Sequence, residues 1–108
     1  MAEVFVNARA VLGTSAVDVY ECPANTKAIV LLAQVSNTTA ASATATVQWT
    51  DSSNSAAVTR LLTGTAVPAN QSMSALSGKL VMEAGDKIQA LGGTASAIEI
   101  SVSVLELS

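Results

Sequence analysis

The sequence TATVQWT at residues 44–50 decides the fold class of this chain, because its polar and apolar side chains alternate without interruption. Ala45, Val47 and Trp49 lie on one side of an extended backbone, and the threonines and Gln48 lie on the other. A period of two is typical of a β-strand with one face in a core and one face in solvent. The same period recurs along most of the chain, so the sequence predicts an all-β protein.

About eight segments carry this pattern or a short apolar run, and turn residues separate them at intervals typical of all-β domains. At 108 residues the chain is one domain. We predict a single antiparallel β-sandwich, Ig-like or jelly-roll-like, with a small closed barrel as the alternative. An N-terminal strand or arm is expected at residues 1–13 and the sandwich domain at residues 14–108. The predicted strands are residues 3–12, 17–20, 28–35, 44–50, 57–63, 79–83, 87–91 and 98–104, with residues 72–76 ambiguous.

Residues 28–35 differ from the other predicted strands because they are apolar on both faces. A strand of this kind is covered on both sides, and a neighbouring subunit could cover one of them. The turn Pro-Ala-Asn precedes this segment at residues 23–25 and recurs at residues 68–70. The repeat indicates either two strands that enter through similar turns or a duplicated half of the fold.

Composition and charge argue against several classes of partner. Only 12% of the residues are charged, against about 25% in ordinary soluble domains. The five Lys and Arg residues are scattered and the net charge is −3, so no basic stripe for nucleic acid is predicted. The uncharged stretch at residues 28–50 is interrupted by polar residues and is unlike the ~20 apolar residues of a spanning helix. We expect no nucleic-acid partner and no membrane partner, and the N-terminus lacks the pattern of a secretory signal.

Few residues could do chemistry. Cys22 is the single soft nucleophile, and a catalytic cysteine needs a base, usually histidine, of which the chain has none. Asp51 is the lone carboxylate in a run of turn residues, which favours an Asx turn over a calcium loop. Glu83 and Asp86 flank a glycine turn, where carboxylates are usually solvated. Trp49 shares its face with apolar residues, which favours core packing, and the sequence as a whole predicts no enzyme, no cofactor and no metal site.

The outward faces of the predicted strands are short and uncharged. Thr46, Gln48 and Ser101 are examples, and the charged residues that protect exposed strand edges from association are missing. Short side chains lose little rotamer entropy on contact, so such faces suit a protein that works in symmetric copies. The first strand, set apart by a Gly-Thr-Ser break at residues 13–15, is a candidate arm for adding to the sheet of a neighbour.

Four segments together resemble small virion proteins of tailed bacteriophages, including phages of marine and aquatic bacteria. They are VYECPANTKAIV at residues 19–30, VQWTDSSN at 47–54, AVTRL at 57–61 and LSGKLVMEAGD at 76–86. The resemblance spans residues 17–107 and rests on the order and spacing of the four segments. The first strand matches least well, so contacts particular to this protein are expected there.

The resemblance implies a structural component of the particle, most like a head decoration (cement) protein on the outside of the capsid. Such proteins commonly sit as trimers between capsomers, so the expected partners are the major capsid protein and further copies of the chain, with a trimer favoured. The expected location is the head surface of a virion made in the host cytoplasm. A neck, tail or fibre-associated protein and a host-surface binding module are the alternatives. The candidate contacts are Glu3, Val4, Phe5, Val6, Asn7, Arg9, Asn37, Thr38, Thr39, Asp51 and Asn54.

Overall fold

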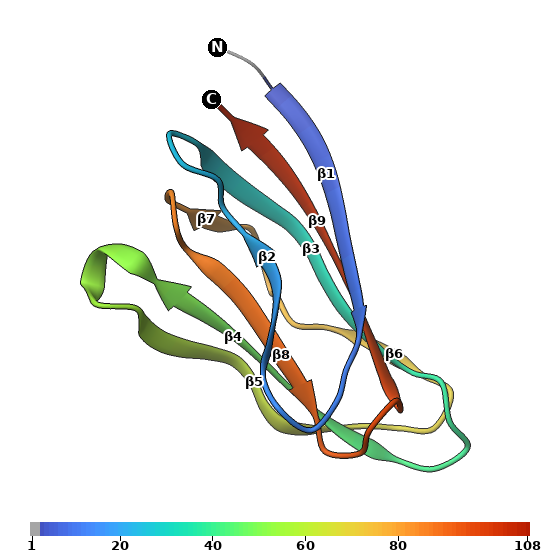
Figure 1. Cartoon of the computed structure of the whole chain (residues 1–108). Coiled ribbons are helices and arrows are strands. Elements are labelled where there is room, and N and C mark those ends of the chain that lie inside the picture. The colour runs from blue at the N-terminus through green and yellow to red at the C-terminus, as the bar shows by residue number, and fades with distance from the viewer. Residues whose placement is uncertain (1–2) are drawn as a thin grey trace.

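The computed structural model describes residues 3–108, which form two antiparallel β-sheets packed face to face as a sandwich (Figure 1). The predicted fold class is confirmed, and the ambiguous segment at residues 72–76 contributes a short ninth strand. Residues 3–108 include no helix of a length and apolarity that could span a membrane. The elements are β1 Glu3–Val11, β2 Val17–Glu21, β3 Lys27–Asn37, β4 Ala43–Asp51, a 3-10 helix Ser52–Asn54, β5 Ala57–Val67, β6 Ser72–Ser74, β7 Leu80–Met82, β8 Lys87–Gly92 and β9 Ile98–Leu107.

The two sheets have separate strand orders. Sheet A has the order β1-β9-β3, and β6 and β7 both pair with the remaining edge of β3. Sheet B has the order β2-β8-β4-β5. Within the described part of the chain no strand pairing joins the sheets, so the fold is a sandwich rather than the closed barrel that the sequence left open. The edge strands β1 and β2 lie on the same side of the sandwich (Figure 1).

The core lies between the sheets and is built from aliphatic side chains. Alternation sends Ile100 and Val102 inward from β9. In β3 it sends Val30 inward, and a register shift between Val30 and Leu32 lets Val35 point inward as well. Full burial of such a side chain stabilises the fold by about 1.5–3 kcal/mol relative to exposure. The largest fully buried apolar side chains are Leu12, Met82, Ile88, Ile98, Ile100, Val30, Val35, Val47, Val67, Val102 and Val104.

β1 is an integral edge strand of sheet A in this structure. It pairs with β9 along its whole length, from Glu3 opposite Leu107 to Val11 opposite Glu99. Leu12, which follows the strand, is fully buried and anchors its end in the core. The addition of this segment to the sheet of a neighbour, as an arm, stays a prediction.

The two Pro-Ala-Asn turns share a backbone shape. Asn25 and Asn70 both adopt the left-handed conformation, with φ of 57° and 58°. Asparagine tolerates this conformation better than most residues because its side chain is short and polar. The strands that follow differ in length and position, since β3 is central in sheet A and β6 is a three-residue edge strand. The repeat is therefore one of turn chemistry and not of a duplicated half.

Candidate interaction surface

The outer face of sheet A carries an apolar row that crosses four strands. Phe5 of β1 lies opposite Leu105 of β9, and Leu105 lies opposite Ile29 of β3. Ile29 in turn lies opposite Val81 of β7. The two ends of the row are the most open, because Phe5 is 74% exposed and Val81 is 62% exposed. Exposed apolar groups that gather in one patch mark sites of interaction.

A β-bulge enlarges this row. The pairing of β3 with β9 shifts its register between Val30 and Leu32, and both Leu31 and Leu32 are left exposed, at 41% and 36%. Leu107, one row further toward the C-terminus, is half-buried on the same face. These residues are termed the apolar patch, which comprises Phe5, Ile29, Leu31, Leu32, Val81, Leu105 and Leu107.

Beyond the apolar patch the outer face of sheet A becomes polar. Asn7 lies opposite Ser103, whose hydroxyl donates to Asn7 Oδ1 at 2.7 Å. Further along, Gln34 Nε2 donates to Ser72 Oγ at 2.9 Å, and the exposed Arg9 lies at the β1 edge. This half of the face is built mostly from short polar side chains, as the sequence predicted, and Val11 at its β1 edge is the exception, at 59% exposed.

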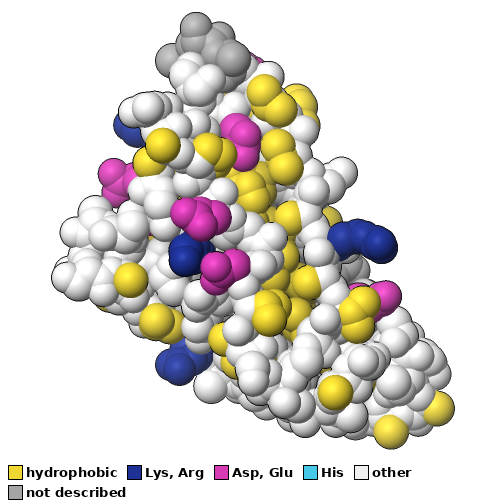
Figure 2. All heavy atoms as spheres, viewed as in Figure 1, with side chains coloured by type: hydrophobic (Ala, Val, Ile, Leu, Met, Phe, Trp, Pro, Cys, Tyr) yellow, Lys and Arg dark blue, Asp and Glu magenta, His cyan; other side chains and the backbone are white. Residues whose placement is uncertain are grey.

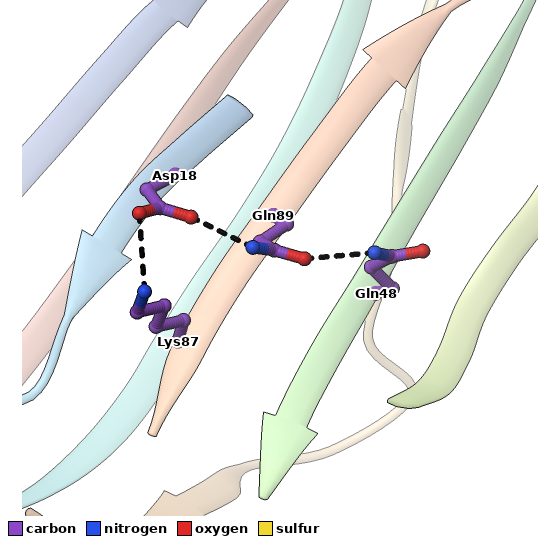
Figure 3. Close-up of polar contacts among 4 residues, drawn as sticks. All are labelled: Asp18, Gln48, Lys87 and Gln89. Carbon is purple, nitrogen blue, oxygen red and sulfur yellow. Dashed lines mark hydrogen bonds and ion pairs between the residues drawn. The ribbon is translucent and has the colours of Figure 1, made fainter. Parts of the chain in front are cut away.

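The outer face of sheet B is crossed by a hydrogen-bonded row instead (Figure 3). Gln89 Nε2 of β8 donates to Asp18 Oδ1 of β2 at 2.7 Å, and Gln48 Nε2 of β4 donates to Gln89 Oε1 at 2.8 Å. Lys87 Nζ lies 3.4 Å from the second carboxylate oxygen of Asp18. The hydrogen bond from Gln89, helped by Lys87, outweighs the effect of burial and holds the pKa of Asp18 below its usual value. The row gives these polar groups partners within the chain.

Asp86 corrects the expectation of a solvated carboxylate at a hairpin tip. Its side chain is 1% exposed and accepts hydrogen bonds from the backbone N–H groups of Glu83 and Ser52, both at 2.9 Å. Ser52 Oγ donates to it at 2.9 Å and Trp49 Nε1 at 3.3 Å. Burial alone would raise the pKa of Asp86, but these bonds outweigh it and the pKa lies below its usual value. Asp86 thereby ties the end of β4 to the turn that precedes β8.

One hydrogen bond crosses between the sheets at the open side of the sandwich. The Tyr20 hydroxyl of β2 donates to Glu106 Oε2 of β9 at 2.6 Å. Burial first, and then the Glu106 carboxylate, raise the pKa of Tyr20 well above its usual value. The bond joins the edge strand of sheet B to the centre of sheet A.

The nucleophilic and metal-ligating side chains do not gather at one site in the described part of the chain. Cys22 is 1% exposed, its thiol donates to the carbonyl of Thr26 at 3.3 Å, and burial raises the pKa of the thiol. A buried thiol with a raised pKa is chemically inert. Within residues 3–108 no three His, Cys, Asp or Glu side chains gather where they could hold a metal ion.

Hydrophobic side chains also show between β1 and β2, on the open side of the sandwich (Figure 2). The inward side chains of Val6, Ala8 and Ala10 are only half-buried there. Val4 at the start of β1 is 50% exposed and Val17 at the start of β2 is 41% exposed. This seam consists mostly of small side chains.

The predicted contact residues of β1 divide between two faces. Alternation places Glu3, Phe5, Asn7 and Arg9 on the outer face of sheet A, where all four are exposed. Val4 and Val6 point to the opposite, inner side of the strand. The remaining candidates lie elsewhere, in the loop after β3 and in the turn after β4, so the structure does not bring the predicted set together.

Asn37 is a structural residue and not an exposed contact. Its side chain is 3% exposed, and its Nδ2 donates to the carbonyls of Ala41 and Val67 at 2.8 and 3.0 Å. Its Oδ1 accepts from the N–H and the hydroxyl of Thr39, at 2.9 and 2.7 Å. These bonds shape the loop between β3 and β4, in which Thr38 is exposed and Thr39 is half-buried.

The turn after β4 has the predicted Asx geometry. Asp51 Oδ1 accepts from the N–H of Ser53 at 3.2 Å and from its hydroxyl at 2.8 Å. Asn54 is exposed at the end of the 3-10 helix. This turn lies beyond β4 and β5, on the side of the molecule away from β1 (Figure 1).

Sequence reasoning missed Leu105 and Val81 as members of an exposed surface. The apolar run at residues 28–35 was the available signal, because half of its side chains needed a second cover. Which residues lie beside that run depends on strand register, and the register became visible only in the structure.

No protein-family model and no curated protein matches the chain. A solved structure from Bacillus endospore appendages, described as a novel family of disulfide-linked pili, is similar at 13% identity with a TM-score of 0.57, over 97% of this chain and 84% of that chain. A pentameric capsid protein isolated from metagenomic phage sequences matches at 17% identity with a TM-score of 0.46, over 94% of this chain and 59% of that chain. The first likeness shows the fold, and any function must be argued from the surfaces.

Proposed function

We propose that the chain is a non-enzymatic structural protein of a phage particle and that it decorates the outside of the head. The observation that carries the proposal is a sheet face with a four-strand apolar row and few charges, in a chain whose sequence resembles phage virion proteins. An exposed apolar face of this kind tends to associate with other protein surfaces. It therefore suits a protein that works among other subunits.

The proposed action is mechanical. Each bound copy adds buried surface across neighbouring capsid subunits and binds the assembled shell in preference to its separated parts. Binding of this kind stabilises the assembled state by mass action, and the effect is repeated at every site on the head. The exposed residues of β1 and the loops around Thr39 and Asn54 remain the proposed contacts with the major capsid protein. The trimer implied by the family resemblance stays a prediction.

Two other roles fit the chain less well. The similar endospore appendages are described as disulfide-linked pili, whereas the one cysteine of this chain, Cys22, is buried and is not placed for a bond between copies. A host-surface binding module needs aromatic or charged anchors in its loops. Residues 38–42 and 93–96 are all Thr, Ala, Ser or Gly. A neck, tail or fibre location differs from the head only in position and copy number.

The decisive experiment adds the purified chain to heads that lack it and measures occupancy by electron cryomicroscopy and the temperature at which the heads rupture. Many copies at positions between capsomers, with a raised rupture temperature, support decoration. A few copies at the portal, neck or tail, or none on the head, contradict it.

A variant pair tests the contribution of β1 to head binding. Deletion of residues 2–12 would remove β1 and Leu12 from sheet and core, so loss of binding would not separate contact from folding. Arg9→Glu reverses one exposed charge on β1, and Arg60→Glu makes the same change on the exposed edge strand β5. We expect weaker head occupancy for Arg9→Glu alone. Equal occupancy of both variants would remove the outer face of β1 from the contact.

A further inference from the structure

We propose that two copies of the chain pack face to face through the outer faces of sheet A, related by a two-fold axis along β9. The occupant of the apolar patch is therefore a second copy of the same chain. This inference concerns the chain itself and goes beyond its location on a particle. It assigns Glu3 and Phe5 to a second copy and leaves Arg9 and the loops around Thr39 and Asn54 to the capsid, so either proposal can fail alone.

The outer face of sheet A is large enough for a weak pairing. With β9 on the axis, β1, β9 and β3 overlap with the second copy, and β7 with Val81 lies outside the overlap. Three strands about 4.8 Å apart and nine residues at about 3.3 Å each give roughly 430 Å². Two such faces would bury about 850 Å² in total, which is the size of a weak, transient interface. Phe5, 74% exposed, is the aromatic anchor of the contact.

The charges beside the patch are arranged for self-complementarity. Glu3 and Lys27 both lie opposite Leu107, one on each side of β9 in a single row. They carry opposite charge, stand two strands apart, about 10 Å, and form no ion pair with each other in this structure. Among residues 3–108 the structure contains one salt bridge, between Lys87 and Asp18 on the other sheet. Glu3 and Lys27 are thus exposed and available to a partner.

A two-fold axis along β9 satisfies both charges at once. Rotation about that axis brings Glu3 of one copy over Lys27 of the second copy, and the reverse, so two ion pairs form together. The same rotation places Phe5 over Ile29 of the second copy and Leu105 over its own equivalent. Burial of apolar groups and pairing of charges therefore agree on one arrangement. A capsid partner would not require opposite charges at equal distances from one strand.

The polar half of the face permits the same arrangement. Ser101 and Ser103 of β9 lie on the axis, and their short side chains allow the sheets to approach. Glu99 also lies on β9 and would face its equivalent, six residues from Leu105. Sheets in a sandwich cross at about 30°, which separates the two Glu99 carboxylates by roughly 10 Å sideways in addition to the sheet spacing. Repulsion over that distance is largely screened at physiological salt.

The experiment is a charge-swap series measured by sedimentation equilibrium from about 1 to 500 µM. We expect the wild-type chain to be a concentration-dependent dimer. Glu3→Lys and Lys27→Glu should each weaken dimerisation by about tenfold, because each variant places like charges in contact twice per dimer. The double variant, Glu3→Lys with Lys27→Glu, should return the dissociation constant to within about threefold of the wild type.

Matched controls separate the face from general effects of charge and apolarity. Glu21→Lys makes the same charge change on β2, in sheet B, and should leave dimerisation unchanged. Phe5→Ser should weaken the dimer by about 100-fold, because two phenylalanine side chains lose their cover. Val58→Ser, at a 46% exposed position on β5, should not weaken it. Unchanged circular dichroism and melting of the variants would show that each still folds.

Three results would overturn the proposal. The first is a monomer at every concentration, and the second is a double variant no tighter than its two parents. The third is a wild-type trimer in place of a dimer, which a single two-fold contact does not produce. A wild-type monomer whose Phe5→Ser variant no longer binds heads would assign the apolar patch to the capsid. A wild-type chain that dimerises but does not bind heads would contradict the decoration role and would leave the dimer proposal intact.

Discussion

Each outer face of the sandwich has one row of side chains that crosses neighbouring strands, and the two rows have opposite chemistry. On sheet B the row runs through Asp18, Gln89 and Gln48, which hydrogen-bond to one another (Figure 3). On sheet A the row from Phe5 to Val81 offers apolar area to solvent. A second subunit would gain about 25 cal/mol for each Å² of apolar area it covers on sheet A. On sheet B it would have to compete with bonds already made.

Sheet B also has a buried polar anchor at one end. Sheet B is closed at one end by the buried carboxylate of Asp86, which holds the turn before β8 and the residue after β4. The largest expected effect on stability is therefore at this position. Asp86→Ala leaves the Trp49 N–H and two backbone N–H groups without their acceptor, which should cost about 3 kcal/mol of unfolding free energy. Urea denaturation of the wild type and the variant at pH 7 measures this loss of unfolding free energy.

Asp51→Ala is the matched control for this change. It removes a carboxylate from the adjacent exposed turn, where Asp51 accepts only from Ser53, and should cost about 0.5–1 kcal/mol. Equal losses for the two variants would show that Asp86 contributes no more than an ordinary turn residue.

The lowered pKa of Asp86 gives this prediction a pH dependence. A carboxyl group with a lowered folded-state pKa contributes stability above its unfolded pKa of about 3.9, and loses it as pH falls through the folded value. Stability of the wild type should fall more steeply below about pH 4 than that of Asp86→Asn. Asp18, whose pKa is also lowered, remains in both proteins and contributes equally. Parallel pH curves would contradict the assignment.

The sequence predicted local structure well because alternation is a local property. Residues 44–50 and 98–104 alternate cleanly and lie within β4 and β9. The chemistry of Asp51, followed by serines, was likewise readable as an Asx turn. These features depend on neighbours in the sequence, so no knowledge of strand pairing was needed.

The sequence did not predict the apolar patch, because the patch depends on strand register between residues far apart in the chain. Leu105 and Ile29 are 76 positions apart in number, and only their pairing on adjacent strands turns two half-buried residues into a patch. Asp86 was interpreted as a solvated charge because its donors Trp49 and Ser52 come from a different hairpin, 37 and 34 residues away. The apolar run of β3 was the one local sign that a face would remain uncovered.

Tyr20→Phe tests the hydrogen bond that joins the two sheets at the open side of the sandwich, and its expected effect on stability is smaller than that of Asp86→Ala. Loss of the hydroxyl that donates to Glu106 should lower the unfolding free energy by about 1–1.5 kcal/mol at pH 7. The pKa of Tyr20 is raised in the fold, so its contribution is complete below the unfolded pKa of about 10 and is lost as pH rises above it.

The variant should therefore approach the wild type in stability between about pH 9 and 11 in chemical denaturation. Both proteins are compared in a Cys22→Ala background, because the Cys22 thiol and the Tyr20 hydroxyl each affect the pKa of the other. A constant difference across this range would mean that the hydroxyl does not titrate differently in the folded and unfolded chain.

A pair of truncations compares the two faces directly. Gln89→Ala removes both hydrogen bonds of the sheet B row and leaves the Gln48 amide, 8% exposed, without its acceptor, which should cost about 1 kcal/mol. Ser103→Ala removes the exposed bond to Asn7 on sheet A and should cost less than about 0.5 kcal/mol. Equal values in urea denaturation would contradict the view that only sheet B depends on its surface bonds.

The smallest expected effect concerns the ion pair beside that row. Lys87 and Asp18 are 3.4 Å apart, but their side chains are 35% and 48% exposed, so water and salt screen the attraction. Lys87→Ala should lower the unfolding free energy by about 0.5 kcal/mol or less, and the difference should vanish in 1 M salt. Lys79→Ala, at an exposed position before β7, is the control. A loss for Lys87→Ala larger than that for Gln89→Ala would mean that charge, and not the hydrogen-bonded row, holds this face together.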